Sequence, residues 1–321
     1  MEQPLVSVNV VSYNASKFIL ETLESISNQT YKNIELIISD DASPDNTVEL
    51  CQNWLAHNKS RFVRTEIITV EKNTGVTANC NRALAASQGE YWKIIGSDDL
   101  LTADCIEKCV AYMQAKPQAR FLFGKQISFT GNFRDGNFKK EELPFRAYFF
   151  RDSVSAKKQY KIITRLAQVG CAPTSFAQTS LLREVGGFNT RFPMNEDTPL
   201  YIHLTSLGHK LWYIDEFLVY RRIHSESIMH QKDSDNAIIG KAWLRYVTGE
   251  WTPFIQENSN WFWCQMSRFS HWMTMNIIRN GNTLKSWKCR FWLRCSKTLN
   301  PYRWSVLYSR IIDRALNLLG Y

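Results

Sequence analysis

Three pairs of adjacent acidic residues in this sequence could take part in chemistry. They are Asp40-Asp41, Asp98-Asp99 and Glu196-Asp197. Carboxylate oxygens are the ligands that hard divalent cations prefer, and a positioned carboxylate can also take a proton from a hydroxyl group. Each pair has a plainer interpretation, because acids in a turn or in the first turn of a helix often only stabilise that local structure. Which of these interpretations applies to a pair depends on the strands and helices that position it.

The first hundred residues alternate apolar runs with helical spacing. The predicted strands are Val6–Val11, Ile34–Ser39, Glu66–Val70 and Tyr91–Ile95. Strands that are continuously apolar, with helices between them, are typical of a parallel sheet buried on both faces. Ligands bind beyond the carboxyl ends of such strands. Because Ser12–Asn14, Asp40-Asp41 and Ser97–Asp99 all lie at strand ends, we expect them to converge on one site.

Local signals also predict the elements around these strand ends. Ser43-Pro44 offers a helix N-cap followed by proline in the first turn. Farther along, helical spacing of leucines over 200–207 follows Glu196-Asp197, and two short strands are predicted at Leu211–Ile214 and Phe217–Tyr220. Between Phe121 and Ala172 the alternation of strands and helices weakens into short strands and loops.

Charge and tryptophan content divide the chain into two regions. Of the net charge of +9, residues 232–321 carry 13 Lys and Arg against 5 Asp and Glu, and 8 of the 11 tryptophans follow residue 240. We predict a domain over residues 1–230 and a helical, basic, tryptophan-rich extension over 231–321, with a linker near Gln231–Asn236.

Two segments of the extension predict amphipathic helices. Trp287, Phe291 and Cys295 share one helical face amid basic residues, and residues 304–319 carry an apolar stripe opposite Arg310 and Arg314. Such helices can lie on an anionic membrane surface. Alternatively, they pack on the first domain or on a twin subunit. No nucleic-acid-binding module is recognisable, so nucleic acid is not an expected partner.

Other features set the broad class of protein. The chain is 44% hydrophobic and 21% charged, which is typical of a folded globular protein. No run of 18 apolar residues is present, and the first residues lack the pattern of a signal peptide. The eight cysteines form no C-x-x-C pair, which favours reduced thiols and a cytoplasmic location.

Taken in order, the motifs resemble those of the inverting glycosyltransferases of family 2, which have the GT-A fold. The resemblance covers roughly residues 5–230, and each motif is weak by itself whereas the ordered set is specific. The matching segments are Val6–Asn14, Ser25–Tyr31, Ile37–Asp45, Asn73–Gly75, Gly89–Tyr91, Gly186–Phe188, Asn195–Asp197 and Tyr220–His224.

The resemblance implies an α/β fold with a Rossmann-like, mostly parallel central sheet flanked by helices. It also implies a nucleotide diphosphate-sugar donor, UDP-linked by preference. Val11 and Tyr13 would contact the nucleotide, with Tyr13 stacked on the base. Asp40 would accept a hydrogen bond from the base ring NH, and Asp98 would contact the ribose or the donor sugar.

The catalytic residues follow from the same resemblance. Asp99 would hold Mn²⁺ or Mg²⁺ against the diphosphate, and His224 would assist the metal or the phosphates. Asp197 would be the general base that deprotonates the acceptor hydroxyl, so the anomeric configuration would invert. The sequence departs from the common Asp-x-Asp-Asp metal loop at Gly96, which leaves open which of Asp98 and Asp99 is the main ligand.

The expected acceptor is a glycan or glycolipid, attached to a lipid diphosphate, in the assembly of a surface polysaccharide such as O-antigen or capsule. The protein would then act in the cytoplasm, in peripheral contact with the inner membrane, and could form a homo-oligomer. The alternative is a non-catalytic carbohydrate- or nucleotide-binding protein that retains the GT-A fold. A phospho-signalling receiver also has early paired aspartates, but it is much shorter than this chain and needs no Glu196-Asp197 pair.

Overall fold

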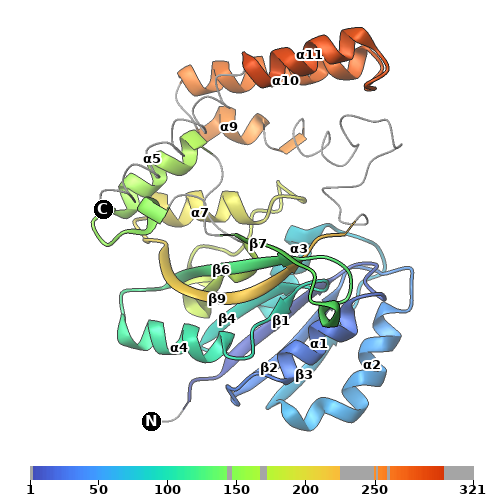
Figure 1. Ribbon diagram of the computed structural model, residues 1–321. Helices are drawn as coiled ribbons and strands as arrows, with labels where there is room; N and C mark the ends of the chain where they lie inside the picture. The colour runs from blue at the N-terminus through green and yellow to red at the C-terminus, as the bar shows by residue number, and fades with distance from the viewer. Residues whose placement is uncertain are drawn as a thin grey trace. The chain divides into compact units, whose positions relative to one another are not determined.

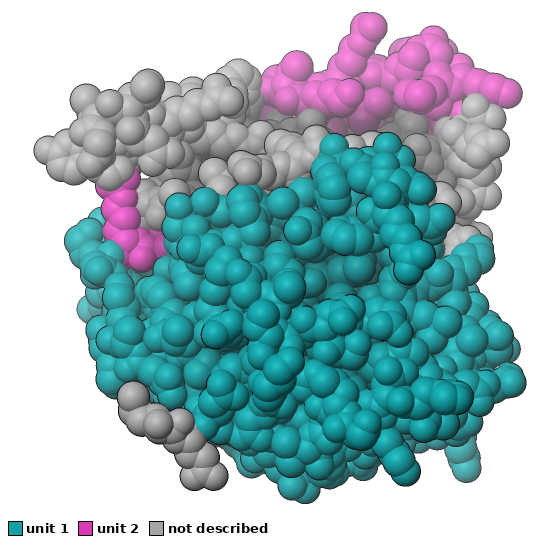
Figure 2. All heavy atoms as spheres, turned by 60° about the horizontal axis from the view of Figure 1, so that its bottom comes forward, with its two compact units in different colours: residues 1–145, 152–159, 169–223 teal, residues 146–151, 160–168, 224–321 magenta. Residues whose placement is uncertain are grey.

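The computed structural model describes residues 3–142, 147–166, 172–224, 249–250, 252–258 and 261–299. The chain forms two compact units, which are coloured separately in Figure 2. Unit 1 contains residues 1–145, 152–159 and 169–223, and unit 2 contains residues 146–151, 160–168 and 224–321. The predicted boundary at residue 230 and the linker near Gln231–Asn236 lie outside the described residues, so the division into two domains stays a prediction.

The first half of unit 1 is a parallel α/β sheet. Its elements are β1 (Val6–Ser12), α1 (Ile19–Ser27), β2 (Ile34–Asp40), α2 (Thr47–Asn58), η1 (Lys59–Arg61), β3 (Arg64–Ile68), α3 (Val76–Ala86) and β4 (Tyr91–Gly96). The strands lie in the order β3-β2-β1-β4, and all three pairings are parallel. Every residue of β2 is buried, as expected for a strand covered on both faces. The four predicted strands are therefore confirmed, with β3 beginning two residues early.

Helices cover both faces of this parallel region (Figure 1). Residues of α1 and α2 pack with Val8 and Val10 of β1 in the main hydrophobic core. Helix α3 lies on the other face, where the Ser87 hydroxyl that follows it bonds Asn9 Oδ1 at 3.1 Å. Asn9 of β1 thus points toward α3, whereas Val8 and Val10 point toward α1 and α2.

The second half of unit 1 makes the sheet mixed. Its elements are β5 (Leu100–Leu101), α4 (Cys105–Ala115), β6 (Phe121–Phe129), η2 (Phe133–Asp135), β7 (Phe138–Glu142), α5 (Ala156–Leu166, which continues into unit 2), η4 (Ala172–Thr174), β8 (Phe176–Gln178), α6 (Thr179–Glu184), α7 (Asp197–Ser206) and β9 (Trp212–Arg222). The order continues β4-β8-β6-β9-β5, and β7 pairs with β6. Among these described pairings, that of β6 with β9 is parallel and the others are antiparallel.

Three details of the fold differ from the sequence prediction. The predicted sheet is mostly parallel, but in the structure parallel pairing dominates only among the strands up to Gly96. The two short strands predicted at Leu211–Ile214 and Phe217–Tyr220 are one strand, β9, which shifts register against β6 near Lys125. Helix α2 begins at Thr47 instead of at Ser43-Pro44, because the backbone and hydroxyl of Ser43 bind the Asp40 carboxylate at 2.8 and 2.6 Å and belong to the loop.

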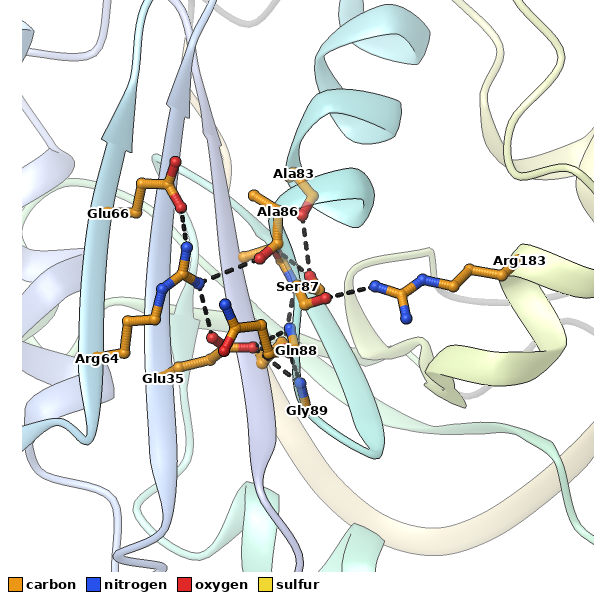
Figure 3. Close-up of polar contacts among 11 residues, drawn as sticks. Glu35, Arg64, Glu66, Ala83, Ala86, Ser87, Gln88, Gly89 and Arg183 are labelled. Carbon is orange, nitrogen blue, oxygen red and sulfur yellow. Dashed lines mark hydrogen bonds and ion pairs between the residues drawn. The ribbon is translucent and has the colours of Figure 1, made fainter.

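A buried ionic network joins the strands at the amino end of the sheet (Figure 3). The Glu35 carboxylate accepts hydrogen bonds from the Ser7 hydroxyl, from Arg64 Nη1 at 2.9 Å and from Gly89 N at 2.9 Å. Burial alone would raise the pKa of Glu35, but these bonds hold that pKa below its usual value. The network therefore keeps a charged carboxylate in the sheet, at the end opposite to the predicted site.

Unit 2 is helical where it is described. Its elements are η3 (Ala147–Phe150), α9 (Thr252–Asn258), α10 (Trp261–Arg279) and α11 (Trp287–Thr298), with the end of α5. The predicted helical extension is thus confirmed for these segments, whereas the amphipathic stripe at 304–319 lies outside the described residues. Among the described helices, none is both long and apolar enough to span a bilayer.

Candidate functional site

The ends of β1, β2 and β4 lie side by side, as the sequence predicts. Ser12 pairs with Asp40, and Val11 pairs with Gly96. The Ser12 carbonyl accepts hydrogen bonds from Asp41 N at 3.0 Å and from Asn79 Nδ2 at 3.3 Å. These bonds bring the ends of two strands and the helix α3 to one edge of the sheet.

Asp40 is fixed within the loop that follows β2. Its carboxylate is buried and accepts from the Ser12 hydroxyl at 2.7 Å as well as from Ser43. The loop after β1 is tied to the same serine, because Asn14 N donates to Ser43 Oγ at 2.8 Å. Tyr13 lies between these anchored residues and is 45% exposed. A rigid carboxylate beside an exposed aromatic ring is suited to an aromatic, hydrogen-bonding ligand.

Asp41 has a different role, which sequence reasoning missed. Its carboxylate accepts from Thr74 N at 2.9 Å, Gly75 N at 2.8 Å and Arg82 Nη2 at 2.7 Å. Burial would raise the pKa of Asp41, but these donors hold it below its usual value. Asp41 thus attaches the end of β2 to the residues just before α3 and to Arg82 within that helix.

The start of α3 in turn anchors the loop that leads to Asp197. Thr77 Oγ1 donates to the Phe192 carbonyl at 2.6 Å. Gly75 has a φ of +91°, and a Cβ there would lie 2.9 Å from the carbonyl oxygen of Pro193, so only glycine fits. This chain of contacts links Asp41 and the start of α7 within unit 1.

Asp197 is the first residue of α7. Its carboxylate accepts from the backbone N of Thr198 and from Thr198 Oγ1 at 3.0 Å. The residue is partly exposed, but its carboxyl group is deeply surrounded by protein, and this burial raises the pKa of Asp197. The Cys80 thiol of α3 also has a raised pKa, from burial and then from the charges of Glu196 and Asp197, which places both acids near α3.

Asp99 is the most deeply buried acid at the edge of β4. It is 6% exposed, and its Oδ1 accepts from Arg222 N at 2.9 Å. Its carbonyl accepts from Thr22 Oγ1 at 2.8 Å. Burial, followed by the neighbouring charge of Asp98, raises the pKa of Asp99 well above its usual value. A carboxyl group held in this state is typical of a site completed by a cation or another ligand.

Gly96 matters for where Asp98 lies. A Cβ at residue 96 would be 2.9 Å from Asp98 Oδ1, so the Asp98 carboxylate is folded over the glycine. A side chain at residue 96, such as the aspartate expected from the family pattern, would displace this carboxylate. The missing first aspartate thus gives Asp98 a position that it could not otherwise take.

Arg222 holds the turn after β4, and sequence reasoning did not assign it a role. Its Nε donates to the Asp98 carbonyl at 3.0 Å, its Nη2 bonds Glu21 Oε2 at 2.8 Å, and its Nη1 donates to the Gly131 carbonyl. The guanidinium lies between the rings of Phe18 and Phe129, 4.8 and 4.6 Å from their centroids. The signal was available, because period-two alternation in a strand turns one of Arg221 and Arg222 inward.

The described acids fit a divalent ion that is shared with a ligand. No group of three His, Cys, Asp or Glu residues in the described ranges could enclose a metal ion. Mg²⁺-type sites in phosphate-binding enzymes commonly use only one or two carboxylates, together with phosphate oxygens. Asp98 and Asp99 satisfy that pattern. His224 belongs to unit 2, and its metal role stays a prediction.

The chain belongs to glycosyl transferase family 2, whose family model matches residues 7–185. The predicted family is therefore confirmed. Solved structures show the same fold. S. aureus TarS 1-349 in complex with UDP-GlcNAc has a TM-score of 0.56 at 18% identity, covering 87% of this chain and 81% of that one. Mannosyltransferase PcManGT from Pyrobaculum calidifontis, in complex with GDP-Man and Mn²⁺, has a TM-score of 0.51 at 18% identity, covering 99% and 80%.

Curated relatives match over different shares of their length. Glycosyltransferase GlyG of Streptococcus pneumoniae is 34% identical over 42% of this chain and 42% of its own. The putative teichuronic acid biosynthesis glycosyltransferase TuaG of Bacillus subtilis is 34% identical over 40% and 47%. The Escherichia coli enzyme WfaP, named UDP-Glc:alpha-D-GlcNAc-diphosphoundecaprenol beta-1,3-glucosyltransferase, is 28% identical over 71% and 81%. Several relatives are thus matched over less than half of their length.

Proposed function

We propose that this protein is an inverting, metal-dependent glycosyltransferase that moves a sugar from a UDP-sugar to a hydroxyl group of a glycan acceptor. The observation that carries the proposal is the Asp98-Asp99 turn, where the buried Asp99 carboxyl group, which accepts from Arg222 N, stands beside a second acid. This turn follows β4, which pairs with β1. The end of β1 leads into the loop of Tyr13. Family membership supplies the reaction class.

The donor would bind along the ends of β1, β2 and β4. Tyr13 stacks on the base, Val11 lines the nucleotide, and Asp40 accepts from the base ring NH, since a carboxylate has about four acceptor positions and three are used by the protein. Asp98 contacts the ribose or the sugar. UDP is favoured by the names of WfaP and of the TarS complex, although PcManGT was solved with GDP-Man.

Asp98 and Asp99 would hold Mn²⁺ or Mg²⁺. Such an ion, when bound, neutralises charge that develops on the leaving diphosphate. Asp197 takes the proton of the acceptor hydroxyl as its oxygen bonds the anomeric carbon. The bond from that carbon to the diphosphate oxygen breaks, and its electron pair leaves with the diphosphate. Attack from the opposite side inverts the configuration.

The acceptor would be a lipid-diphosphate-linked glycan in the assembly of a surface polysaccharide such as O-antigen or capsule. Support comes from the name of WfaP, which specifies a diphosphoundecaprenol-linked acceptor. The protein would then work in the cytoplasm, peripherally on the inner membrane, with a homo-oligomer as a compatible form.

The decisive experiment compares Asp197→Asn with Glu196→Gln, which removes the neighbouring carboxylate. Loss of a general base slows such reactions by about 10²- to 10⁴-fold, so we expect that loss in kcat for Asp197→Asn with UDP affinity unchanged. Because burial raises the pKa of Asp197, kcat of the native protein should fall as the pH drops into the acidic range. Glu196→Gln should retain most activity.

Other outcomes would contradict the assignment. Loss of activity in Glu196→Gln with activity retained in Asp197→Asn would exchange the roles of the two acids. UDP binding by the native protein without transfer to any acceptor glycan would favour the non-catalytic alternative.

A further inference from the structure

Helices α10 and α11 of unit 2 form a hairpin with its own small core. Met273 and Ile277 of α10 and Cys289 of α11 are buried, and the Cys289 thiol contacts the Ile277 carbonyl at 3.3 Å. The Cys289 thiol donates to the Asn280 carbonyl at 3.0 Å, and the Ser286 hydroxyl caps α11 by accepting from Cys289 N at 3.4 Å. The hairpin is therefore a built structure with a defined inner side and a separate outer surface.

The outer surface of the hairpin carries a run of aromatic rings. Phe269 stacks on Trp272 at 5.8 Å, Trp272 meets Trp292 edge-on at 4.9 Å, and Trp292 meets Phe291 at 5.4 Å. Trp272 is 47% exposed, Phe291 52% and Trp287 65%. Large exposed apolar side chains that are contiguous across two helices mark an interaction surface.

The charge on the hairpin has one sign. Residues 258–312 contain no Asp or Glu. The exposed basic residues of the described part are Arg268, Arg279, Lys285, Lys288, Arg290, Arg294 and Lys297. Figure 2 shows long side chains projecting from unit 2. Tryptophan and phenylalanine interleaved with lysine and arginine, without any acid, match the interface of an anionic bilayer.

We infer that the α10–α11 hairpin binds the surface of a membrane that contains anionic phospholipids. The aromatic rings enter the headgroup region, and the basic side chains contact lipid phosphates. No described helix can span a bilayer, so the helices lie in the interface. A second copy of the chain fits less well, because the hairpin has no acidic residues to complement its own charge. The inference rests on the proposed function only for its purpose, which is to bring the enzyme to a lipid-linked acceptor.

The test is sedimentation of the full-length protein with two kinds of vesicle, phosphatidylcholine alone and phosphatidylcholine mixed with phosphatidylglycerol. We expect binding to the anionic vesicles, weak binding to the neutral ones and release at about 0.5 M NaCl, because the Debye length falls to about 4 Å at that ionic strength. Brominated phosphatidylglycerol should quench the tryptophan emission, since the rings lie at the level of the headgroups and upper acyl chains.

Paired variants locate the surface. Lys288→Glu with Arg294→Glu should weaken binding to anionic vesicles about 100-fold. Lys59→Glu with Lys72→Glu, the same charge change on exposed lysines of unit 1, should weaken it far less. Trp272→Ser with Phe291→Ser should abolish the quenching, whereas Phe138→Ser, at an exposed phenylalanine of unit 1, should leave it intact.

Several results would overturn the inference. These are equal binding to both kinds of vesicle, hairpin variants that bind like the native protein, or a dimer that dissociates in Trp272→Ser without any vesicle binding. The outcome is separable from the proposed function. Asp197→Asn should bind vesicles normally, and the hairpin variants should transfer sugar to a water-soluble acceptor at the native rate.

Discussion

The environment of Asp99 disfavours the charged form of its carboxyl group. Its carboxyl group is buried, its neighbour Asp98 is also acidic, and the donor that the structure gives to Oδ1 is the backbone N of Arg222. Buried charges in proteins are normally compensated by a counter-charge or a metal. Such an arrangement costs stability in the absence of ligand and supplies binding energy when a cation arrives.

We therefore predict that Asp99→Asn stabilises the metal-free protein at neutral pH. The folded-state pKa is raised, so folded Asp99 keeps a proton that the unfolded chain has lost. Stability therefore falls as the pH rises from the unfolded pKa, about 3.9, toward the folded one. Asn removes that loss and can still accept from Arg222 N. The free energy of unfolding should rise by about 1 kcal/mol, which corresponds to about 2–4 °C in Tm.

Thermal unfolding in EDTA at several pH values measures this effect. The difference in Tm between Asp99→Asn and the native protein should shrink as the pH is lowered toward 4. Asp104→Asn is the matched control. Burial would raise the pKa of Asp104, but its bond with Lys108 at 2.9 Å holds that pKa low, so its removal should not stabilise at any pH. A Tm for Asp99→Asn below that of the native protein at pH 7.5 would contradict the account.

Residue chemistry was only partly predictable from the sequence. The acidic pairs at strand ends predicted that the ends of β1, β2 and β4 lie together, as they do, because parallel strands present their carboxyl ends at one edge. The sequence could not show that Asp40 and Asp41 have different structural roles. The role of Asp41 depends on its bonds with Thr74 and Arg82, which lie far from both aspartates along the chain. Strand alternation indicated that one of Arg221 and Arg222 points inward, but it could not indicate the partner of Arg222, because Glu21 lies 201 residues earlier.

At the scale of elements, the amino end of the sheet is fixed by a tight approach of the loop before β4 to β1. A Cβ on Gly89 would lie 2.6 Å from Ser7 N and 2.8 Å from the Leu5 carbonyl oxygen, both backbone atoms that cannot move aside without shifting β1. Gly89 N also donates to Glu35 within the network of Figure 3.

Gly89→Ala should accordingly destabilise the protein by about 3 kcal/mol, the upper part of the range for overpacking. Gly186→Ala is the control. Gly186 has a φ of +80° and nothing within 4 Å of an added Cβ, so only the left-handed conformation is penalised, by about 1 kcal/mol. Urea denaturation of both variants measures the difference. Equal losses of stability in the two variants would mean that β1 shifts to make room for the added methyl group.

Elements with local signals were predicted well, and those that depend on distant pairing were not. The strands before residue 96 have apolar runs of ordinary length, so the sequence defined them. Strand β8 is only three residues long, and its antiparallel pairing with β4 and β6 joins segments that are distant in the sequence. Periodicity over so short a segment carries little information. The mixed half of the sheet therefore had to come from the structure.

At the scale of the whole molecule, the proposed activity requires nucleotide and metal to bind as one unit. The described residues offer only two carboxylates in the turn after β4, too few to hold an ion tightly without phosphate oxygens. Nucleotide and metal should therefore stabilise the fold cooperatively, since each completes the site of the other.

We predict that UDP with Mn²⁺ raises Tm by more than the sum of the two separate effects. A ligand at 100 times its dissociation constant stabilises the folded state by about 2.7 kcal/mol, which corresponds to roughly 5–10 °C. GDP with Mn²⁺ should give a smaller shift if Asp40 and Tyr13 recognise uracil. Asp99→Asn should retain the shift from UDP alone and lose the excess due to metal. If UDP gave the same shift in Mn²⁺ and in EDTA, the carboxylates of this turn would not be joined to the diphosphate through a cation, and metal-dependent transfer would have to be abandoned.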